Sequence, residues 1–224
     1  MGICSMAARR HIPISTGEMV KMPIVYPAGG IGGGRFSFSH GDHANRRSVP
    51  PIFVEVGPGR GDFLFHLAEA NPDKSVVGIE IKRKRVDKLI SRIETRGLKN
   101  ITIIQDDARC ALPRFFGENS VDAIYVNFPD PWPKRRHEKN RVLSRDFLED
   151  CCKVLKFYGN LNVTTDFQPY AETVANEVEA IPLLETCFPE VVKNRSDDAY
   201  PTLFAKKWVN MGRTIYYQKY QRTI

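Results

Sequence analysis

The sequence predicts an α/β fold, with a doubly wound, mostly parallel seven-stranded sheet and an antiparallel hairpin at its C-terminal edge. From Pro51 onward, short β-branched runs alternate with amphipathic stretches, the pattern of successive strand–helix units. A glycine-rich turn, Gly57-Pro-Gly-Arg-Gly61, stands between the first such run and the first amphipathic stretch. The chain ends on two further strand-like segments, which favours the hairpin.

The individual elements are predicted from the periodicity of hydrophobic residues and from the glycine and proline residues that end helices and strands. We expect strands at residues 52–56, 75–80, 101–105, 121–127 and 161–165, a weaker one at 183–188 and a last one at 213–220. We expect helices at residues 62–69, 82–96, 144–156 and 171–180. Gly97 ends the second helix, and Tyr158-Gly159 forms the turn before the fifth strand.

Residues 1–50 differ in composition from the rest. Residues 27–35 are rich in glycine and residues 37–47 are polar, and neither stretch has a hydrophobic period. No Gly-Lys-Ser/Thr follows the glycines, so a phosphate-binding loop is not expected there. We therefore expect a flexible or poorly ordered segment at 1–50 and one domain at 51–224.

Composition restricts the classes of function. No apolar run reaches the roughly 20 residues that span a bilayer, and the first 22 residues lack the apolar core of a secretory signal, so a cytoplasmic protein is expected. The formal net charge of +7 makes nucleic acid a candidate partner, with a solvated basic surface as the alternative. The five cysteines have no CxxC spacing, so we expect reduced, mostly buried thiols and no metal ion.

The glycine-rich turn indicates a nucleotide-like cofactor. Its spacing is G-x-G-x-G rather than the dinucleotide pattern G-x-G-x-x-G, and the acidic Glu55 precedes it within the strand. A carboxylate there favours a ligand that carries positive charge, such as the amino and sulfonium groups of S-adenosylmethionine. The predicted cofactor site therefore includes Glu55, Gly57, Gly59 and Gly61.

Further cofactor contacts are expected after the next strands. Glu80 ends the second strand, where an acid accepts hydrogen bonds from ribose hydroxyls in doubly wound folds. Asp107 and Ala108 follow the third strand, where a carboxylate and an amide can meet the adenine edge, although a helix N-cap at Asp106 or Asp107 would also explain an acid there. Asn127, at the end of the fourth strand, completes the predicted cofactor set.

The segment that follows the fourth strand carries the predicted chemistry. It reads Asn127-Phe-Pro-Asp-Pro-Trp-Pro-Lys-Arg-Arg-His-Glu-Lys-Asn-Arg141. Three prolines stiffen the backbone around Asp130 and Trp132, which limits the entropy cost of ordering them. Because ligands bind beyond the carboxyl ends of such strands, a carboxylate, an aromatic ring and a group of cations are expected beside the cofactor.

This segment resembles the tRNA (guanine-N7)-methyltransferases, whose pattern is F-P-D-P-W-P-K-x-x-H-x-K-R-R. The match runs from Phe128 through Lys139. Gly78-Ile-Glu80 and Thr165-Asp-Phe-Gln-Pro-Tyr170 are similar to the family's G-I-E and T-D-W-x-x-Y, and the resemblance covers about residues 51 to 222. It implies a Rossmann-like methyltransferase fold and methyl transfer from S-adenosylmethionine, with release of S-adenosylhomocysteine, to N7 of a guanine in tRNA, namely guanine 46 in the variable loop.

The resemblance also implies roles for individual residues. Asp130 is the catalytic residue, which accepts hydrogen bonds from guanine and stabilises the charge that develops on its ring. The expected substrate-binding residues are Trp132, Lys134, Arg135, Arg136, His137, Lys139, Arg141, Asp166 and Thr202. For His137, two alternatives to substrate binding stay open: it braces Asp130, or it is an ordinary surface histidine. The partner is tRNA, and the oligomeric state, monomer or homodimer, is left open.

Two positions depart from the family pattern. Asn140 replaces one residue of the adjacent basic pair, and Ala205 replaces the glutamate of T-x-F-E, an acid associated with holding the guanine base. Two other interpretations of the chain stay open. Residues 127–132 are also similar to the Asn/Asp-Pro-Pro-aromatic loop of amino-group methyltransferases, which implies an exocyclic base amine or a protein side chain as the acceptor. The loss of the glutamate at Ala205 leaves a noncatalytic RNA-binding relative as the other.

Overall fold

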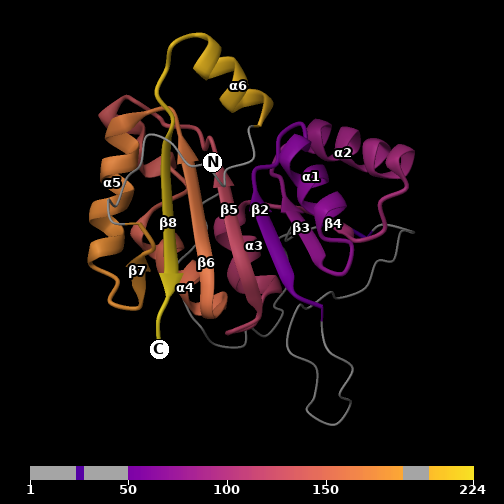
Figure 1. The fold of residues 1–224 in the computed structure, drawn as a ribbon, viewed down its shortest axis with the longest axis horizontal. Coiled ribbons are helices and arrows are strands. Elements are labelled where there is room, and N and C mark those ends of the chain that lie inside the picture. Colours follow the sequence, from indigo (N-terminus) through magenta and orange to yellow (C-terminus); the bar gives the residue numbers. More distant parts are fainter. Residues whose placement is uncertain (1–23, 28–49, 189–201) are drawn as a thin grey trace, which may run out of the picture.

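The computed structural model describes residues 24–27, 50–188 and 202–224, and within these ranges the strands form one eight-stranded sheet (Figure 1). The strands are β1 (Ile24–Pro27), β2 (Ile52–Val56), β3 (Ser75–Ile79), β4 (Ile101–Gln105), β5 (Val121–Asn127), β6 (Leu155–Thr165), β7 (Leu184–Thr186) and β8 (Tyr216–Arg222). The helices are α1 (Asp62–Ala70), α2 (Arg83–Arg96), α3 (Ala108–Phe115), α4 (Arg145–Val154), α5 (Gln168–Glu179) and α6 (Leu203–Asn210), with a 3₁₀ helix η1 (Arg135–Asn140).

The sheet confirms the predicted topology. Its order is β1-β4-β3-β2-β5-β6-β8-β7, and neighbouring strands from β4 to β6 pair in parallel. The strand β8 runs antiparallel to both β6 and β7, which is the predicted C-terminal hairpin. Because β2 is followed on one side by β3 and on the other by β5, the topological switch point lies between β2 and β5.

Within residues 1–50, which were expected to be flexible or poorly ordered, residues 24–27 form a strand. They form β1, which pairs antiparallel with β4 along its full length and adds an edge strand to the seven expected. Residues 1–23 and 28–49, including most of the glycine run, lie outside the described ranges. The boundary of the domain at residue 51 stays a prediction.

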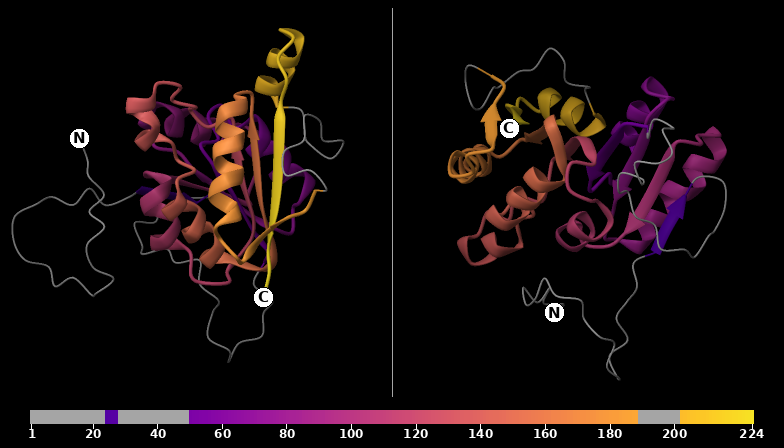
Figure 2. Two further views of the ribbon diagram at one scale, coloured as in Figure 1. Left: turned by 90° about the vertical axis from the view of Figure 1, so that its left-hand side faces the viewer. Right: turned by 90° about the horizontal axis from the view of Figure 1, so that it is seen from below.

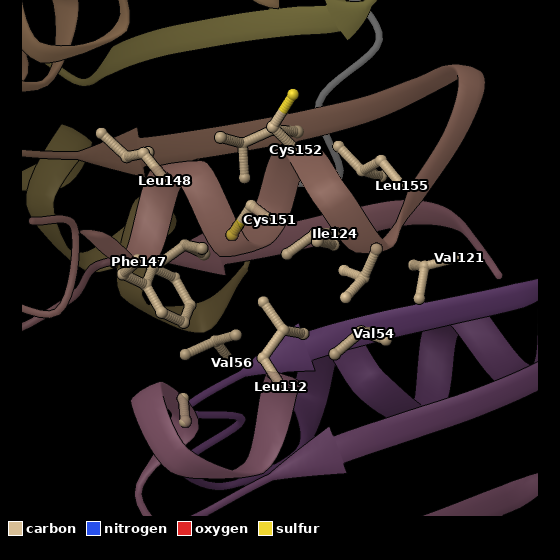
Figure 3. Packing of buried hydrophobic residues seen from close by; sticks show 14 of the residues in the cluster. Val54, Val56, Leu112, Val121, Ile124, Phe147, Leu148, Cys151, Cys152 and Leu155 are labelled. Carbon is tan, nitrogen blue, oxygen red and sulfur yellow. The ribbon is translucent and has the colours of Figure 1, made fainter. Parts of the chain in front are cut away.

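Helices cover both faces of the sheet (Figures 1 and 2). One apolar cluster joins α3, α4 and α5 to β2, β5 and β6, and a second joins α1 and α2 to β3 and β4. In Figure 3, Leu112 of α3 lies among Val54, Val56 and Phe147, so α3 and α4 pack together on the same part of the sheet. The strands that carry the site are therefore packed against helices on both faces of the sheet.

Several element boundaries differ from the prediction. β6 begins at Leu155 rather than at residue 161, because the residues expected as a turn form an irregularity in the strand at Tyr158, whose φ is 65°. The helix expected at 144–156 ends at Val154. α6 and η1 were not predicted, and α3 was anticipated only through the alternative of a helix N-cap at Asp106 or Asp107. α2 ends where expected, at Gly97, whose left-handed φ of 64° needs no Cβ.

The described cysteines fit the prediction in part. Cys151 and Cys152 are buried in the core, where burial raises the pKa of both thiols, whereas Cys110 is half-buried and Cys187 is exposed. Cys4 lies outside the described ranges. As for membrane crossing, none of the helices in the described ranges combines the length and the apolar character that a bilayer span requires.

Candidate functional site

The candidate site lies at the carboxyl ends of the parallel strands. Because β2 to β6 run in one direction, the residues that follow them meet at one edge of the sheet. β8 begins beside the carboxyl end of β6, where Tyr216 pairs with Thr165, and α6 lies just before it (Figure 1). The glycine turn, the Asp130 segment and α6 therefore surround the same edge.

The glycine turn between β2 and α1 is built from left-handed residues. Gly57, Gly59 and Gly61 have φ values of 68°, 58° and 82°. A Cβ on Gly61 would lie 2.5 Å from Leu89 Cδ2 and 2.7 Å from Phe65 Cζ, so this glycine permits the close packing of the turn on α1 and α2. A Cβ on Gly57 would meet nothing within 4 Å, so the backbone there is open to a ligand.

Glu55 lies on β2 at the switch point and is almost fully buried, at 3% exposure. Its Oε1 accepts a hydrogen bond from Asn127 Nδ2 of β5 at 3.4 Å, but its Oε2 has no hydrogen-bond partner among the described residues. Burial raises the pKa of this carboxyl group to about 8. An unpaired buried carboxyl is costly, so the arrangement fits a ligand that brings a cationic donor.

Glu80, directly after β3, is also buried and half satisfied. Its Oε1 accepts a hydrogen bond from the Lys82 amide at 2.8 Å, while its Oε2 has no hydrogen bond and lies 3.5 Å from the Arg85 guanidinium. One acceptor atom is thus available to a hydroxyl donor. Both predicted acids of the first two strands fit the cofactor proposed from the sequence.

Asp107 behaves as the alternative interpretation expected, as a helix cap. Its carboxylate accepts from the Arg109 amide and pairs with the Arg109 side chain at the start of α3. Burial raises the pKa of Asp107, but these bonds to Arg109 outweigh burial and lower it overall. Ala108 is the buried first residue of α3. Contact of this pair with adenine stays a prediction.

The Asp130 segment leaves β5 in a strained conformation. Phe128 and Trp132 have φ values of 50° and 41°, which non-glycine residues rarely adopt. The Phe128 amide donates to Thr164 O at 2.7 Å, which anchors the segment to β6. Asp130 itself is exposed to solvent. Its carboxylate is therefore accessible to a substrate beside the switch point.

Cations gather on the 3₁₀ helix η1 that follows and at the residue just before it. The exposed ones are Lys134, Arg135, Arg136 and Lys139. His137 is half-buried, accepts a hydrogen bond from Arg136 Nε at 3.2 Å and packs edge-on against the Trp132 ring at 5.5 Å. His137 therefore braces Trp132, not Asp130.

The placement of Arg141 does not favour its predicted phosphate contact. The residue is 8% exposed, and its guanidinium donates to the carbonyl oxygens of Pro131 and Trp132. A cation turned inward onto the loop backbone does not present its charge to solvent, so Arg141 belongs to the support of the segment.

Asp166 and Thr202, predicted to bind substrate, hold α6 in place instead. Asp166 forms an ion pair with Arg213, which stacks over the Trp208 ring at 3.9 Å. Thr202 Oγ1 caps α6 by accepting from the Ala205 amide at 3.0 Å. Because both side chains have these internal partners, their positions do not favour direct contact with substrate.

A cavity of about 210 Å³ opens beside the segment, and Ala205 contributes to its wall. Its other lining residues include Asn127, Phe128, Thr164 and Thr202. A larger cavity of about 340 Å³ lies toward the amino ends of β5 and β6, against Asp122 and Lys156, away from Asp130. Position relative to the switch point decides between them, so the smaller cavity is the candidate for a base.

Phe204 was missed by the sequence analysis. It lies on α6, is 53% exposed and has its ring centroid 5.9 Å from that of Phe128. An exposed ring beside the site can stack on an unpaired base. The cap residue Thr202, followed by aromatic residues four apart at Phe204 and Trp208, was the available signal for this helix.

The described residues contain no group of three or more His, Cys, Asp or Glu side chains placed to hold a metal ion. The expectation that no metal takes part stays a prediction.

Comparison with known proteins gives a family match. A family model described as "Putative methyltransferase" matches residues 50–218. A relative from Aquifex aeolicus named tRNA (guanine-N(7)-)-methyltransferase is 37% identical over 169 residues, 75% of this chain and 55% of the relative. Relatives of the same name are 35% identical in Thermotoga maritima, over 74% of this chain and 52% of that protein, and 33% identical in Nitrosomonas europaea, over 75% of each. The chain thus spans about half the length of the first two.

Solved structures with low sequence identity share the fold. The aminoglycoside resistance methyltransferase NpmB1 has a TM-score of 0.58 at 16% identity, covering 90% of this chain and all of that one. A SAM dependent methyltransferase from Aquifex aeolicus has a TM-score of 0.55 at 17% identity, covering 78% of this chain and 85% of that one. These similarities confirm the predicted Rossmann-like methyltransferase fold.

The pKa of Glu55 predicts how stability depends on pH. Between the ordinary value of 4.5 and about 8, the folded protein holds a proton that the unfolded chain has lost. The free energy of unfolding of the ligand-free protein should therefore fall as pH rises through this window, by on the order of a few kcal/mol. Denaturant unfolding at pH 5, 6.5 and 8 measures the slope.

Glu55→Gln should remove most of this slope, because the amide does not titrate. Glu185→Gln, which changes an exposed residue of β7, serves as the control and should keep it. Equal slopes for the parent and Glu55→Gln would show that Glu55 ionises normally in the folded protein.

Proposed function

The chain belongs to the tRNA (guanine-N7)-methyltransferase family, and from that premise we propose that it transfers a methyl group from S-adenosylmethionine to N7 of a guanine in tRNA. The observation that carries the proposal is the half-satisfied Glu55 at the switch point, with the Asp130 segment leaving the adjacent strand. A cationic cofactor and a base acceptor would meet there. We further propose guanine 46 of the variable loop as the target and the cytoplasm, where tRNA is available, as the location.

The cofactor-binding residues have distinct tasks in this proposal. The cofactor, when bound, supplies an activated methyl group on a sulfonium centre. Glu55 would accept a hydrogen bond from the amino group of the cofactor and Glu80 would accept one from a ribose hydroxyl, while the open backbone at Gly57 would leave room for its chain. Asn127 keeps Glu55 oriented from β5. Asp107 and Ala108, the N-cap and first residue of α3, would line the adenine side of the cofactor.

The chemistry requires little acid–base work from the protein. Guanine N7 has an available lone pair and no proton to remove, so alignment and electrostatic stabilisation provide the rate. The exposed Asp130 carboxylate accepts hydrogen bonds from the guanine edge and stabilises the positive charge that methylation places on the ring. The Phe128 amide, which donates to Thr164 O on β6, anchors the start of the segment before substrate arrives.

RNA binding is assigned to the exposed cations and rings around the site. Lys134, Arg135, Arg136 and Lys139 provide charge for phosphates, and Phe204 provides a surface on which a base can stack. Trp132 is half-buried and held by His137, so it forms a wall rather than a free stacking ring. These assignments agree with the net charge of +7.

Methylation of tRNA tests the proposal together with the role of Asp130. Unmodified tRNA and methyl-labelled cofactor should yield N7-methylguanosine on nucleoside analysis. Asp130→Asn should lower turnover by about 100-fold or more with cofactor affinity within twofold, because the charge acts in the transition state. Asp146→Asn, an exposed acid on α4, is the control and should keep full turnover.

Other products would identify the alternatives. Label on an exocyclic amine would assign a different methyl acceptor, and tRNA binding without any methylation would assign a noncatalytic relative. A tRNA that lacks guanine 46 should lose the label if that base is the target.

Salt dependence tests the phosphate contacts. Replacing Arg135 and Arg136 by Ala should weaken tRNA binding and flatten the slope of log affinity against log salt by about 0.7 to 0.9 for each phosphate that is no longer neutralised. The double variant Lys88→Ala, Lys99→Ala removes the same charge from exposed positions away from the segment and should keep the slope. Equal slopes for both double variants would remove Arg135 and Arg136 from the RNA interface.

A further inference from the structure

The segment that carries Asp130 cannot hold its own conformation through backbone hydrogen bonds alone. Pro129, Pro131 and Pro133 have no amide hydrogen to donate, and the segment runs outside the strands. Two of its residues, Phe128 and Trp132, have left-handed φ values, which persist only where the surroundings enforce them. Something outside the segment must therefore fix it.

Arg141 supplies such a contact. Its Nε donates to the carbonyl oxygen of Pro131 at 2.9 Å, and one of its terminal nitrogens donates to the carbonyl oxygen of Trp132 at 3.5 Å. These carbonyls belong to the two residues that directly follow Asp130. A planar guanidinium that reaches both carbonyls fixes their direction, which a single ammonium group does not.

Arg141 is itself fixed by its surroundings. Its guanidinium carbon lies 5.0 Å from the ring centroid of Tyr170 on α5, and Glu138 pairs with it at 3.5 Å. Tyr170 is fully buried, and its hydroxyl accepts from the Leu143 amide at 3.1 Å. A chain of contacts thus links the core helix α5, through Tyr170 and Arg141, to the backbone beside Asp130.

We infer that Arg141 and Tyr170 form a positioning pair, which sets the reactive geometry of Asp130 through the Pro131 and Trp132 carbonyls. The expected effect on turnover rests on the proposed function, whereas the contacts of Arg141 with the segment do not depend on that function. It also means that Tyr170 does more than pack in the core, because it helps to hold the Asp130 segment through Arg141. The pair acts on the segment and does not touch phosphate.

Arg141→Lys tests the pair because it keeps the charge and removes the planar two-carbonyl contact. We expect kcat to fall about 10- to 100-fold, with tRNA affinity, its salt slope and the KM for cofactor within twofold of the parent. Tyr170→Leu, which removes the ring, should reproduce this pattern. Arg145→Lys, a half-exposed arginine of α4 paired with Glu177, is the matched control and should keep kcat.

The indole of Trp132 reports on the segment without any activity. In a Trp208→Phe background, Trp132 is the one indole left in the chain. Arg141→Lys should increase the quenching of Trp132 fluorescence by acrylamide, because the indole becomes more accessible, while Arg145→Lys should leave the quenching unchanged. This readout tests the positioning pair separately from the proposed function. If the parent protein proved inactive but Arg141→Lys still increased the quenching of Trp132, the positioning pair would stand and the proposed function would be rejected.

Two results would overturn the inference. One is unchanged kcat and unchanged Trp132 protection in Arg141→Lys. The other is full turnover at saturating tRNA in Arg141→Ala together with weaker tRNA binding and a flatter salt slope, which would make Arg141 a phosphate contact.

Discussion

The parallel pairing of β2 with β5 is the constraint on which the site depends. It places Glu55 against Asn127 inside the sheet, with one carboxylate oxygen bonded and the other unpaired. No cation of the described residues pairs with Glu55, in contrast to Glu80, which lies near Arg85. An unpaired acceptor of this kind costs about 1 to 3 kcal/mol in the free protein. A ligand with a cationic donor would offset that cost.

The cations near the site divide into two groups by burial. Those on η1 are exposed and can release counterions when they meet phosphate, whereas Arg141 is turned inward onto carbonyl oxygens. Arg213 is exposed like the lysines of α6, but its guanidinium pairs with Asp166 and stacks over the Trp208 ring. Net charge alone therefore overstates the number of cations available for the proposed RNA contacts, because burial and internal pairing occupy some of them.

The sequence was sufficient where local pattern and fold agree. The strands at residues 101–105 and 121–127 lie where they were predicted, because each is a short β-branched run bounded by polar or acidic residues. It was insufficient for β1, a four-residue edge strand whose pairing with β4 is a long-range contact. α6 was missed because the helix is short and two of its large apolar side chains, Phe204 and Val209, are exposed rather than packed in the core. The roles of Arg141 and Asp166 depend on partners distant in sequence, Tyr170 and Arg213, which spacing does not reveal.

Proton release on cofactor binding tests the central claim about Glu55 most directly. With its pKa near 8, the carboxyl group is mostly protonated at pH 7 in the free protein and should ionise against a cationic amino group. Calorimetry of S-adenosylmethionine binding at pH 7, in two buffers of different ionisation enthalpy, should show release of about one proton, and Glu55→Gln should show almost none. The absence of proton release from the parent protein, at measurable cofactor affinity, would contradict this role of Glu55.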